Sequence, residues 1–334
     1  MCCNVRCWYA GLSVLVVLIA VALKGVHEKS NDKQPLPVVQ PKTFGVPLRP
    51  DVKVVVMLSG WPDTHNVWGK QVEAMQDEYH IVSIVSPDHD RSALRKPWGY
   101  TLEEVPKMIQ ACIDLHLGAG RKIDLLVTHD WGALYGYYIM QLWKESGERR
   151  VERLVAIDIG ASENDDASLP SSIPGITQAT LFSVPYQLFL GTLFAVGSGL
   201  SESVAELITA NGWPLMPLLT PMKTNFDWES EAVRPQQEVK WFMGYTYFYL
   251  WVGRLGLGPP VPSPLFPTVP TLFVYGGEKR TMFHSEAFVE RLKATPGSHA
   301  IEYKDSSHWL MYTDSNRFNK DLLEFASIGY VTGN

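Results

Sequence analysis

The sequence predicts an α/β protein with a mostly parallel, doubly wound sheet, an inserted helical segment and an N-terminal membrane segment. Three observations predict this architecture. Short runs of β-branched residues alternate with longer runs of helical spacing, which is typical of a parallel sheet covered by helices. The segment 161–265 interrupts that alternation before it resumes. An uncharged apolar run lies near the N-terminus, at 7–23.

Composition narrows the function classes. The 334 residues suffice for one large catalytic core with an inserted lid. The chain has 29 basic and 35 acidic residues, a net charge of −6, and no basic patch, so a nucleic-acid partner is excluded. Three of the four cysteines are Cys2, Cys3 and Cys7, which leaves Cys112 alone in the body. The body therefore forms no internal disulfide.

The apolar run 7–23 is closed by Lys24. Its length falls between the span of about 20 residues that a bilayer needs and the shorter core of a signal peptide. The interfacial pair at 8–9 favours an uncleaved anchor, and the small residues at 20–22 keep a cleaved signal peptide as the alternative.

The flanking charges predict the orientation of this anchor. Arg6 alone precedes the run, and Lys24, Lys29, Lys33 and Lys42 follow it. The positive-inside rule then places the body in the cytosol, as a single-pass protein of the endoplasmic reticulum. Acylation of the cysteines at 2–3 would require the opposite orientation.

The elements of the body follow in order. We expect strands at 52–58, 80–86, 123–128, 153–159, 271–276 and 299–304, and helices at 68–75, 101–117, 133–144, 284–293 and 316–325. The strands are nearly continuous in apolar residues, as in sheets that are buried on both faces. Thr101 and Glu104 have the spacing of a capping box, so the second helix begins there.

These elements predict a domain organisation. It consists of an anchor at 1–26, a linker at 27–46, a core at 47–160 and 266–334, and a helical cap at 161–265. Residues 167–201 carry no charge and are expected as helical pieces divided at Pro170, Pro174 and Pro185, and the aromatic run 241–251 is helical in character. This apolarity fits packing on the core and an apolar route to a small apolar substrate equally well.

Three short runs at strand ends could carry chemistry. Asp130 lies in the run THDWG at 128–132, where a strand turns into a helix. The run LSGWP at 58–62 follows an earlier strand, and DSSHW at 305–309 follows the last one. Singly, they fit a helix cap, a turn and an ordinary histidine. Together, in this order, they have the arrangement of a nucleophile elbow, an oxyanion loop and a histidine base.

On these motifs the chain resembles the epoxide hydrolase and haloalkane dehalogenase branch of the α/β-hydrolases. The resemblance rests on the elbow HDWG at 129–132, the loop SGWP at 59–62 and the pair HW at 308–309. The runs PD at 87–88 and YTLE at 100–103 support it. The resemblance covers residues 50–327 and implies an α/β-hydrolase fold with an inserted cap. It implies no cofactor and no metal.

The resemblance also implies residue roles. Asp130 would attack an alkyl carbon, His308 would activate water, and the backbone N–H groups of Trp61 and Trp131 would hold the oxyanion. A carboxylate suits this electrophile because it is ionised at neutral pH and forms an ester that water can cleave, whereas a serine would form a stable ether.

The acid that supports His308 departs from the family's pattern. Its usual run E-K-D is here EKR at 278–280, so Arg280 stands in place of the carboxylate. The alternative position follows the strand after the elbow helix, where Asp158 lies. We expect Asp158 to be the acid and keep Glu278 as the reserve.

The cap tyrosines depart as well. Epoxide hydrolases use two phenols to protonate the opening ring, and Tyr186 resembles the first of them. Phe242 stands where the second is expected, so Tyr245, about one helical turn onward, is the candidate. Packing is the alternative role for this aromatic helix. A dehalogenase would instead need indole N–H donors, which Trp61 and Trp131 could supply.

The sequence thus predicts a hydrolase that opens an epoxide to a diol through an ester on Asp130. A haloalkane dehalogenase with the same nucleophile is the second possibility. A non-catalytic binding protein on the same scaffold is the third, and Arg280 and Phe242 would both favour it. Nothing in the residues indicates an oligomeric state.

Overall fold

The computed structural model describes residue 17 and residues 19–89, 95–162, 176–212, 239–279 and 282–327, with 176–183 described as backbone. Its strands form one seven-stranded sheet in the order β1-β3-β2-β4-β5-β6-β7. Only the edge pair β1–β3 of this sheet is antiparallel, and every other neighbouring pair is parallel. The prediction of a mostly parallel sheet is confirmed.

After β1, which the sequence did not predict, the elements of the core alternate along the chain as expected. The strands are β1 (Lys42–Gly45), β2 (Lys53–Leu58), β3 (Tyr79–Ile84), β4 (Leu125–His129), β5 (Leu154–Ile157), β6 (Thr271–Gly276) and β7 (His299–Tyr303). The helices of the core are η1 (His65–Trp68), α2 (Gly69–Met75), α3 (Glu104–Leu117), α4 (Trp131–Glu145), α8 (Glu286–Lys293), α9 (Leu310–Thr313) and α10 (Ser315–Ser327).

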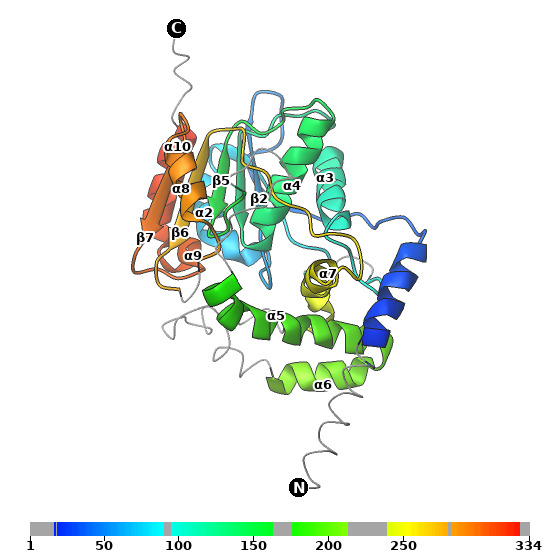
Figure 1. Cartoon of the computed structure of the whole chain (residues 1–334). Helices are drawn as coiled ribbons and strands as arrows, with labels where there is room; N and C mark the ends of the chain where they lie inside the picture. Colours follow the sequence, from blue (N-terminus) through cyan, green and yellow to red (C-terminus); the bar gives the residue numbers. More distant parts are fainter. Residues whose placement is uncertain are drawn as a thin grey trace, which may run out of the picture.

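Helices cover both faces of the sheet (Figure 1). Alternate residues of β2 point to opposite faces, so Val54 and Val56 join one apolar core and Val55 and Met57 the other. The first core is completed by α3, α4 and α8, and the second by α2, α9 and α10. This double burial explains why the strands are apolar without alternation.

Further helices lie between β5 and β6 in the chain. They are α5 (Ile176–Gly199), α6 (Glu202–Gly212), η3 (Trp241–Gly244) and α7 (Tyr245–Arg254). α5 packs against α6, η3 and α7, and Figure 1 shows α5 and α7 beside one end of the sheet, with α6 outside α5. These helices occupy the predicted cap, whose bounds at 161–265 stay a prediction because parts of it lie outside the described residues.

One expectation for the cap is wrong. Pro185 was expected to divide two helical pieces, but it lies inside α5, which continues to Gly199. Packing of this uncharged helix against three neighbouring helices outweighs the single backbone hydrogen bond that a proline removes. Pro170 and Pro174 lie outside the described residues.

The segment 27–46, which was expected as a linker, packs against the core instead. A helix runs over 19–31, and β1 follows it at the sheet edge. The buried Lys29 forms an ion pair with Glu104 at 2.8 Å and donates to the carbonyl of Gly99, and Asp32 pairs with Lys96 at 2.9 Å. These partly buried ion pairs attach to the core a segment that the sequence predicted as a linker.

The same helix also contacts the cap. Val21 lies close to Gly199, at the end of α5. A Cβ atom on Gly199 would lie 2.6 Å from Cγ1 of Val21. Most of the predicted membrane segment 7–23 lies outside the described residues, and within the part that is described no helix is long and apolar enough to cross a membrane.

Candidate active site

Asp130 occupies a sharp turn between β4 and α4. Its backbone has φ 52° and ψ −126°, a conformation that non-glycine residues rarely adopt. A Cβ on Gly132 would lie 2.3 Å from the carbonyl oxygen of Leu58, and one on Gly60 would lie 2.3 Å from Cβ of Asp130. Glycine at both positions therefore lets the loop after β2 approach the turn closely.

The loop after β2 presents a donor to the Asp130 carboxylate. The backbone N–H of Trp61 donates to Oδ2 of Asp130 at 2.8 Å. Burial alone would raise the pKa of Asp130, but hydrogen bonding and charge from His308, the charge of His129 and a hydrogen bond from the Trp131 backbone lower it below its usual value. The carboxylate is therefore ionised at neutral pH, with two backbone donors on it.

His308 lies between the two predicted carboxylates. Its Nε2 is 3.5 Å from Oδ1 of Asp130, and its Nδ1 hydrogen-bonds Oδ2 of Asp158. Burial lowers the pKa of His308, but Asp158 and Asp130 together raise it to about 9. At neutral pH the imidazole is therefore protonated while Asp130 keeps its charge.

Asp158 follows β5 and is completely buried. Its Oδ1 accepts hydrogen bonds from the backbone N–H of Gly276, at 3.2 Å, and from Nζ of Lys279. Burial raises the pKa of this carboxyl, but the charges of Lys279 and His308 and their hydrogen bonds lower it well below its usual range. Sequence reasoning did not identify Lys279 as part of the site. The signal available was its position beside Arg280 in the altered run.

Glu278, the reserve acid, is placed differently. Its backbone N–H donates to the carbonyl of Ser306 at 2.9 Å. Among the described contacts, no hydrogen bond or ion pair joins its carboxylate to His308. Of the two candidate acids, the structure brings Asp158 to the imidazole, and Arg280 lies outside the described residues.

A second buried network holds the His308 loop against the turn. Nε1 of Trp309 donates to both oxygens of Asp63, at 2.9 and 3.0 Å. Nδ1 of His129 lies 3.2 Å from Oδ2 of Asp63, and its Nε2 lies 3.0 Å from the carbonyl of His308. Asp63 and His129 are completely buried. This network connects the three loops that follow β2, β4 and β7.

Two cap tyrosines face the site, and one of them was not expected. The rings of Tyr186 and Tyr247 meet edge to face at 5.6 Å, and Tyr247 meets the rings of Trp61 and Trp131 at 5.3 and 5.6 Å. Burial raises the pKa of Tyr186 to about 12, and burial, with the charges of Tyr186 and Asp130, raises that of Tyr247 well above its usual value. Both phenols therefore keep their protons at neutral pH.

Tyr245, the predicted second phenol, points elsewhere. Its hydroxyl donates to the carbonyl of Pro87 at 3.0 Å, and that of Tyr249 donates to Trp98 at 2.8 Å. The expectation that Tyr245 joins the site is wrong. Residues four apart share a helix face, so 245 and 249 lie together and Tyr247 lies on the opposite face. That spacing separates Tyr247 from Tyr245, but the packing of α7 decides which of the two faces meets the site.

The indole groups of the two site tryptophans bond within the protein. Nε1 of Trp61 donates to the carbonyl of Met243 at 3.1 Å. The Trp131 ring contacts Tyr247, and this contact acts against the rise of the phenol's pKa. In the part of the chain that the structure describes, no group of three histidine, cysteine, aspartate or glutamate side chains could hold a metal ion.

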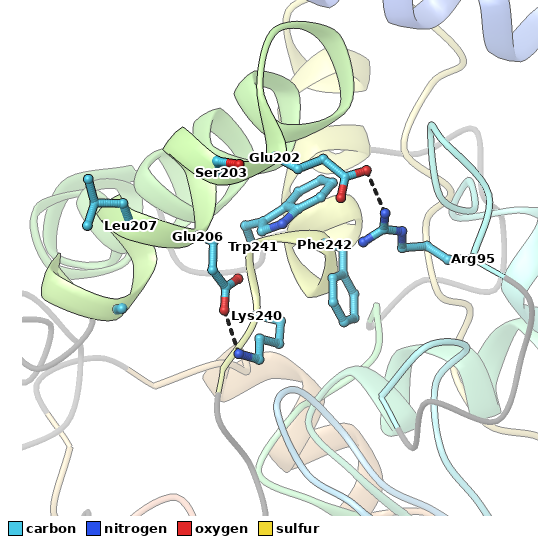
Figure 2. Close-up of a pocket in the computed structure, with 9 residues that line it drawn as sticks. Arg95, Glu202, Ser203, Glu206, Leu207, Lys240, Trp241 and Phe242 are labelled. Atoms are coloured by element: carbon cyan, nitrogen blue, oxygen red, sulfur yellow. Dashed lines mark hydrogen bonds and ion pairs between the residues drawn. The ribbon is translucent and has the colours of Figure 1, made fainter.

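A surface pocket lies on the cap, away from these residues (Figure 2). Its lining comes from α6, from η3 with the residue before it, and from Arg95 of the segment between β3 and α3. Two ion pairs border it, Arg95–Glu202 at 2.6 Å and Lys240–Glu206 at 2.5 Å. The pocket shares no lining residue with the candidate active site.

Comparison with known proteins identifies the family of this arrangement. The family model described as "Alpha/beta hydrolase family" matches residues 55–320. The chain belongs to the alpha/beta hydrolase family. The match extends from β2 into α10 and so includes Asp130, Asp158 and His308. A comparison with curated proteins finds no significant match.

Solved structures share the fold of this alpha/beta hydrolase at low sequence identity. An epoxide hydrolase from Bacillus megaterium has 16% identity and a TM-score of 0.55, over 86% of this chain and 96% of that one. An epoxide hydrolase from metagenomes of hot environments has 16% identity and a TM-score of 0.57, over 87% and 100%. The enol-lactonase from Burkholderia xenovorans LB400 has 16% identity and a TM-score of 0.55, over 86% and 95%.

We expect Asp158→Asn to lower the pKa of His308 below about 9, because one of the two carboxylates that raise it is lost. The free energy of unfolding should fall by about 3–5 kcal/mol, because Lys279 is left buried without its anion. Histidine ¹⁵N NMR and urea unfolding measure the two effects.

The raised pKa also sets the pH dependence of this stabilisation. The imidazolium stabilises the fold fully below its ordinary pKa of 6.5, and this stabilisation is lost as the pH rises to about 9. Asp158→Asn should flatten this dependence. Glu278→Gln is the matched control and should change neither quantity. An effect of Glu278→Gln on the His308 titration would contradict the assignment.

Proposed function

We propose that this alpha/beta hydrolase opens an epoxide to a diol through an ester on Asp130. The observation that carries the proposal is a carboxylate at the elbow, with the Trp61 N–H on Oδ2 and two protonated phenols, Tyr186 and Tyr247, in the cap beside it. A carboxylate nucleophile suits an alkyl carbon, and the phenols suit a leaving oxygen that must take a proton.

The first step uses Oδ1 of Asp130. Oδ2 accepts from the Trp61 N–H at 2.8 Å, which leaves Oδ1 to attack a ring carbon. The new bond joins Oδ1 to that carbon, the carbon–oxygen bond of the ring breaks, and the departing oxygen takes a proton from Tyr186 or Tyr247. The product of this step is a hydroxyalkyl ester of Asp130.

The second step uses His308. Esterification removes the charge of Asp130, and with it one of the two anions that raise the pKa of His308. The imidazolium proton passes through solvent to the phenolate that ring opening leaves. The neutral imidazole can then accept a proton from water, and the resulting hydroxide attacks the carbonyl carbon of the Asp130 ester. The N–H groups of Trp61 and Trp131 stabilise the oxyanion. As it collapses, the bond to the substrate oxygen breaks, that oxygen takes the proton of the new acid to complete the diol, and the carboxylate of Asp130 is regenerated.

The indole contacts favour an epoxide over a haloalkane. A leaving halide needs free donors, but the Trp61 indole donates to Met243, and the Trp131 ring packs edge to face with Tyr247. The substrate we propose is small and apolar, because α5 carries Tyr186 and has no charged residue. The low-identity epoxide hydrolase neighbours support this proposal only through their shared fold.

We expect His308→Gln to trap the ester. Alkylation needs Asp130 and the cap phenols but no base, whereas loss of the base slows hydrolysis by about 10²- to 10⁴-fold. Mass spectrometry after mixing with a terminal epoxide should show an adduct on Asp130. Asp130→Asn is the control and should form none. Normal turnover in His308→Gln would contradict the mechanism, and no adduct in any variant would favour the binding protein.

Tyr247→Phe should slow alkylation by about 10-fold or more, and the double change with Tyr186→Phe by about 10²- to 10⁴-fold, because the departing oxygen loses its proton donors. Single-turnover kinetics measure this step. The matched control is Tyr245→Phe, which removes the same hydroxyl two residues away and should leave alkylation within about 2-fold. If Tyr245→Phe slows alkylation more than Tyr247→Phe does, Tyr245 is the second phenol after all.

We also propose that the N-terminal segment holds the enzyme at a membrane, with the body in the cytosol. The support is the uncharged run 7–23 and the excess of lysine after it. The protein should stay with microsomes through high-salt and carbonate washes, and protease added outside should digest the body. A soluble chain that begins near residue 23 would instead identify a cleaved signal peptide.

A further inference from the structure

Lys279 is a buried cation at the far side of the acid that contacts His308. Its side chain lies in the loop after β6, is completely buried, and donates to Oδ1 of Asp158. The same carboxylate bonds His308 through Oδ2. Phe283, whose ring lies 5.4 Å from Nζ, closes one side of the cation. Asp158 is thus shared between an imidazole and an ammonium group.

The charges around His308 come from several elements. Asp130 and His129 face it from the elbow, Asp158 faces it from the end of β5, and Asp63 lies behind His129. Lys279 lies beyond Asp158, in the same loop region as His284. Burial and the charge of Lys279 lower the pKa of His284 to about 4, although the charge of Asp158 acts to raise it. The field of this ammonium group therefore reaches its neighbours.

Two states of the site can be compared by charge. In the free enzyme, Asp130 and Asp158 are anions and Lys279 is a cation, so a protonated His308 makes these four groups neutral. After esterification of Asp130, the pair of Asp158 and Lys279 is already neutral, so these groups balance only when His308 is uncharged. Without Lys279, the remaining anion would hold the proton on His308 at the stage when it must act as a base.

We propose that Lys279 is a positioning residue that balances the charge of Asp158, so that His308 becomes a neutral base once Asp130 is esterified. This inference rests on the proposed ester mechanism. Lys279 touches neither substrate nor the reacting atoms, and it acts through Asp158. The ammonium group also fixes the carboxylate, because its hydrogen bond and that of the Gly276 N–H hold Oδ1 while Oδ2 faces the imidazole.

The first test needs no catalysis. In full-length protein labelled with ¹⁵N-histidine, Asp130→Asn imitates the uncharged ester, and the His308 signals are assigned by their loss in His308→Gln. Adding Lys279→Gln to Asp130→Asn should raise the pKa of His308 by about 1–3 pH units. Lys279→Arg keeps the charge and should leave the pKa near its value in Asp130→Asn. Lys293→Gln, the same change at an exposed site, should leave it unchanged.

The second test follows the chemistry. Lys279→Gln should move the pH dependence of ester hydrolysis upward by about 1–3 pH units, because hydrolysis needs the neutral imidazole, and should change alkylation less. Lys279→Arg should restore the original profile. An unchanged His308 pKa in the first test, or an unshifted hydrolysis profile in the second, would overturn the inference.

The two proposals fail in different ways. Absence of any adduct with epoxides in the unaltered protein would refute the proposed function, and the NMR test would still decide the effect of Lys279 on His308. A ¹⁵N signal of the Lys279 side chain in the unaltered protein decides the matter if Lys279→Gln does not fold. A neutral amine at pH 7 would overturn the inference, and an ammonium group would support it.

Discussion

The close approach of the loop after β2 to the turn at Asp130 is the constraint on which the rest of the site depends. Gly132 allows the first turn of α4 to lie against the carbonyl of Leu58, and Gly60 allows the loop to pass beside Asp130 itself. This contact brings the Trp61 N–H to the carboxylate and holds Asp130 in its unusual backbone conformation. The parallel sheet brings these loops together, because the carboxyl ends of β2, β4 and β5 lie at the same edge of the sheet.

Charge is distributed in the buried site so that each group compensates a neighbour. Asp158 accepts from a cation on one oxygen and an imidazole on the other, and Asp63 accepts from Trp309 beside His129. Burying any of these ions alone would be strongly unfavourable. Removal of one partner therefore leaves the other as a buried charge whose desolvation is no longer compensated. The same coupling means that a change of charge at Asp130 is felt at His308 without any movement of the chain.

Much of this arrangement could be predicted from the sequence. The parts that were not predicted have one cause in common. The sheet, the position of Asp130 and that of His308 follow from local patterns, since strand ends and turns are encoded by neighbouring residues. Tyr247 was missed because the cap helix begins with the 3₁₀ turn η3, so the face that meets the site depends on how α7 packs against α5. Lys279 and the packed segment at 27–46 depend on partners far along the chain, Asp158 and Glu104, which no local pattern names.

The helix over 19–31 has a mechanical consequence. It is fastened to the core through Lys29 and Asp32, and at its other end Val21 lies against the last turn of α5. Figure 1 shows this helix alongside the end of α5. Because residues 27–46 are packed on the core, a displacement of this helix would be transmitted to α5, the helix that carries Tyr186. The helix over 19–31 thus connects the core directly to the last turn of the cap helix that carries Tyr186.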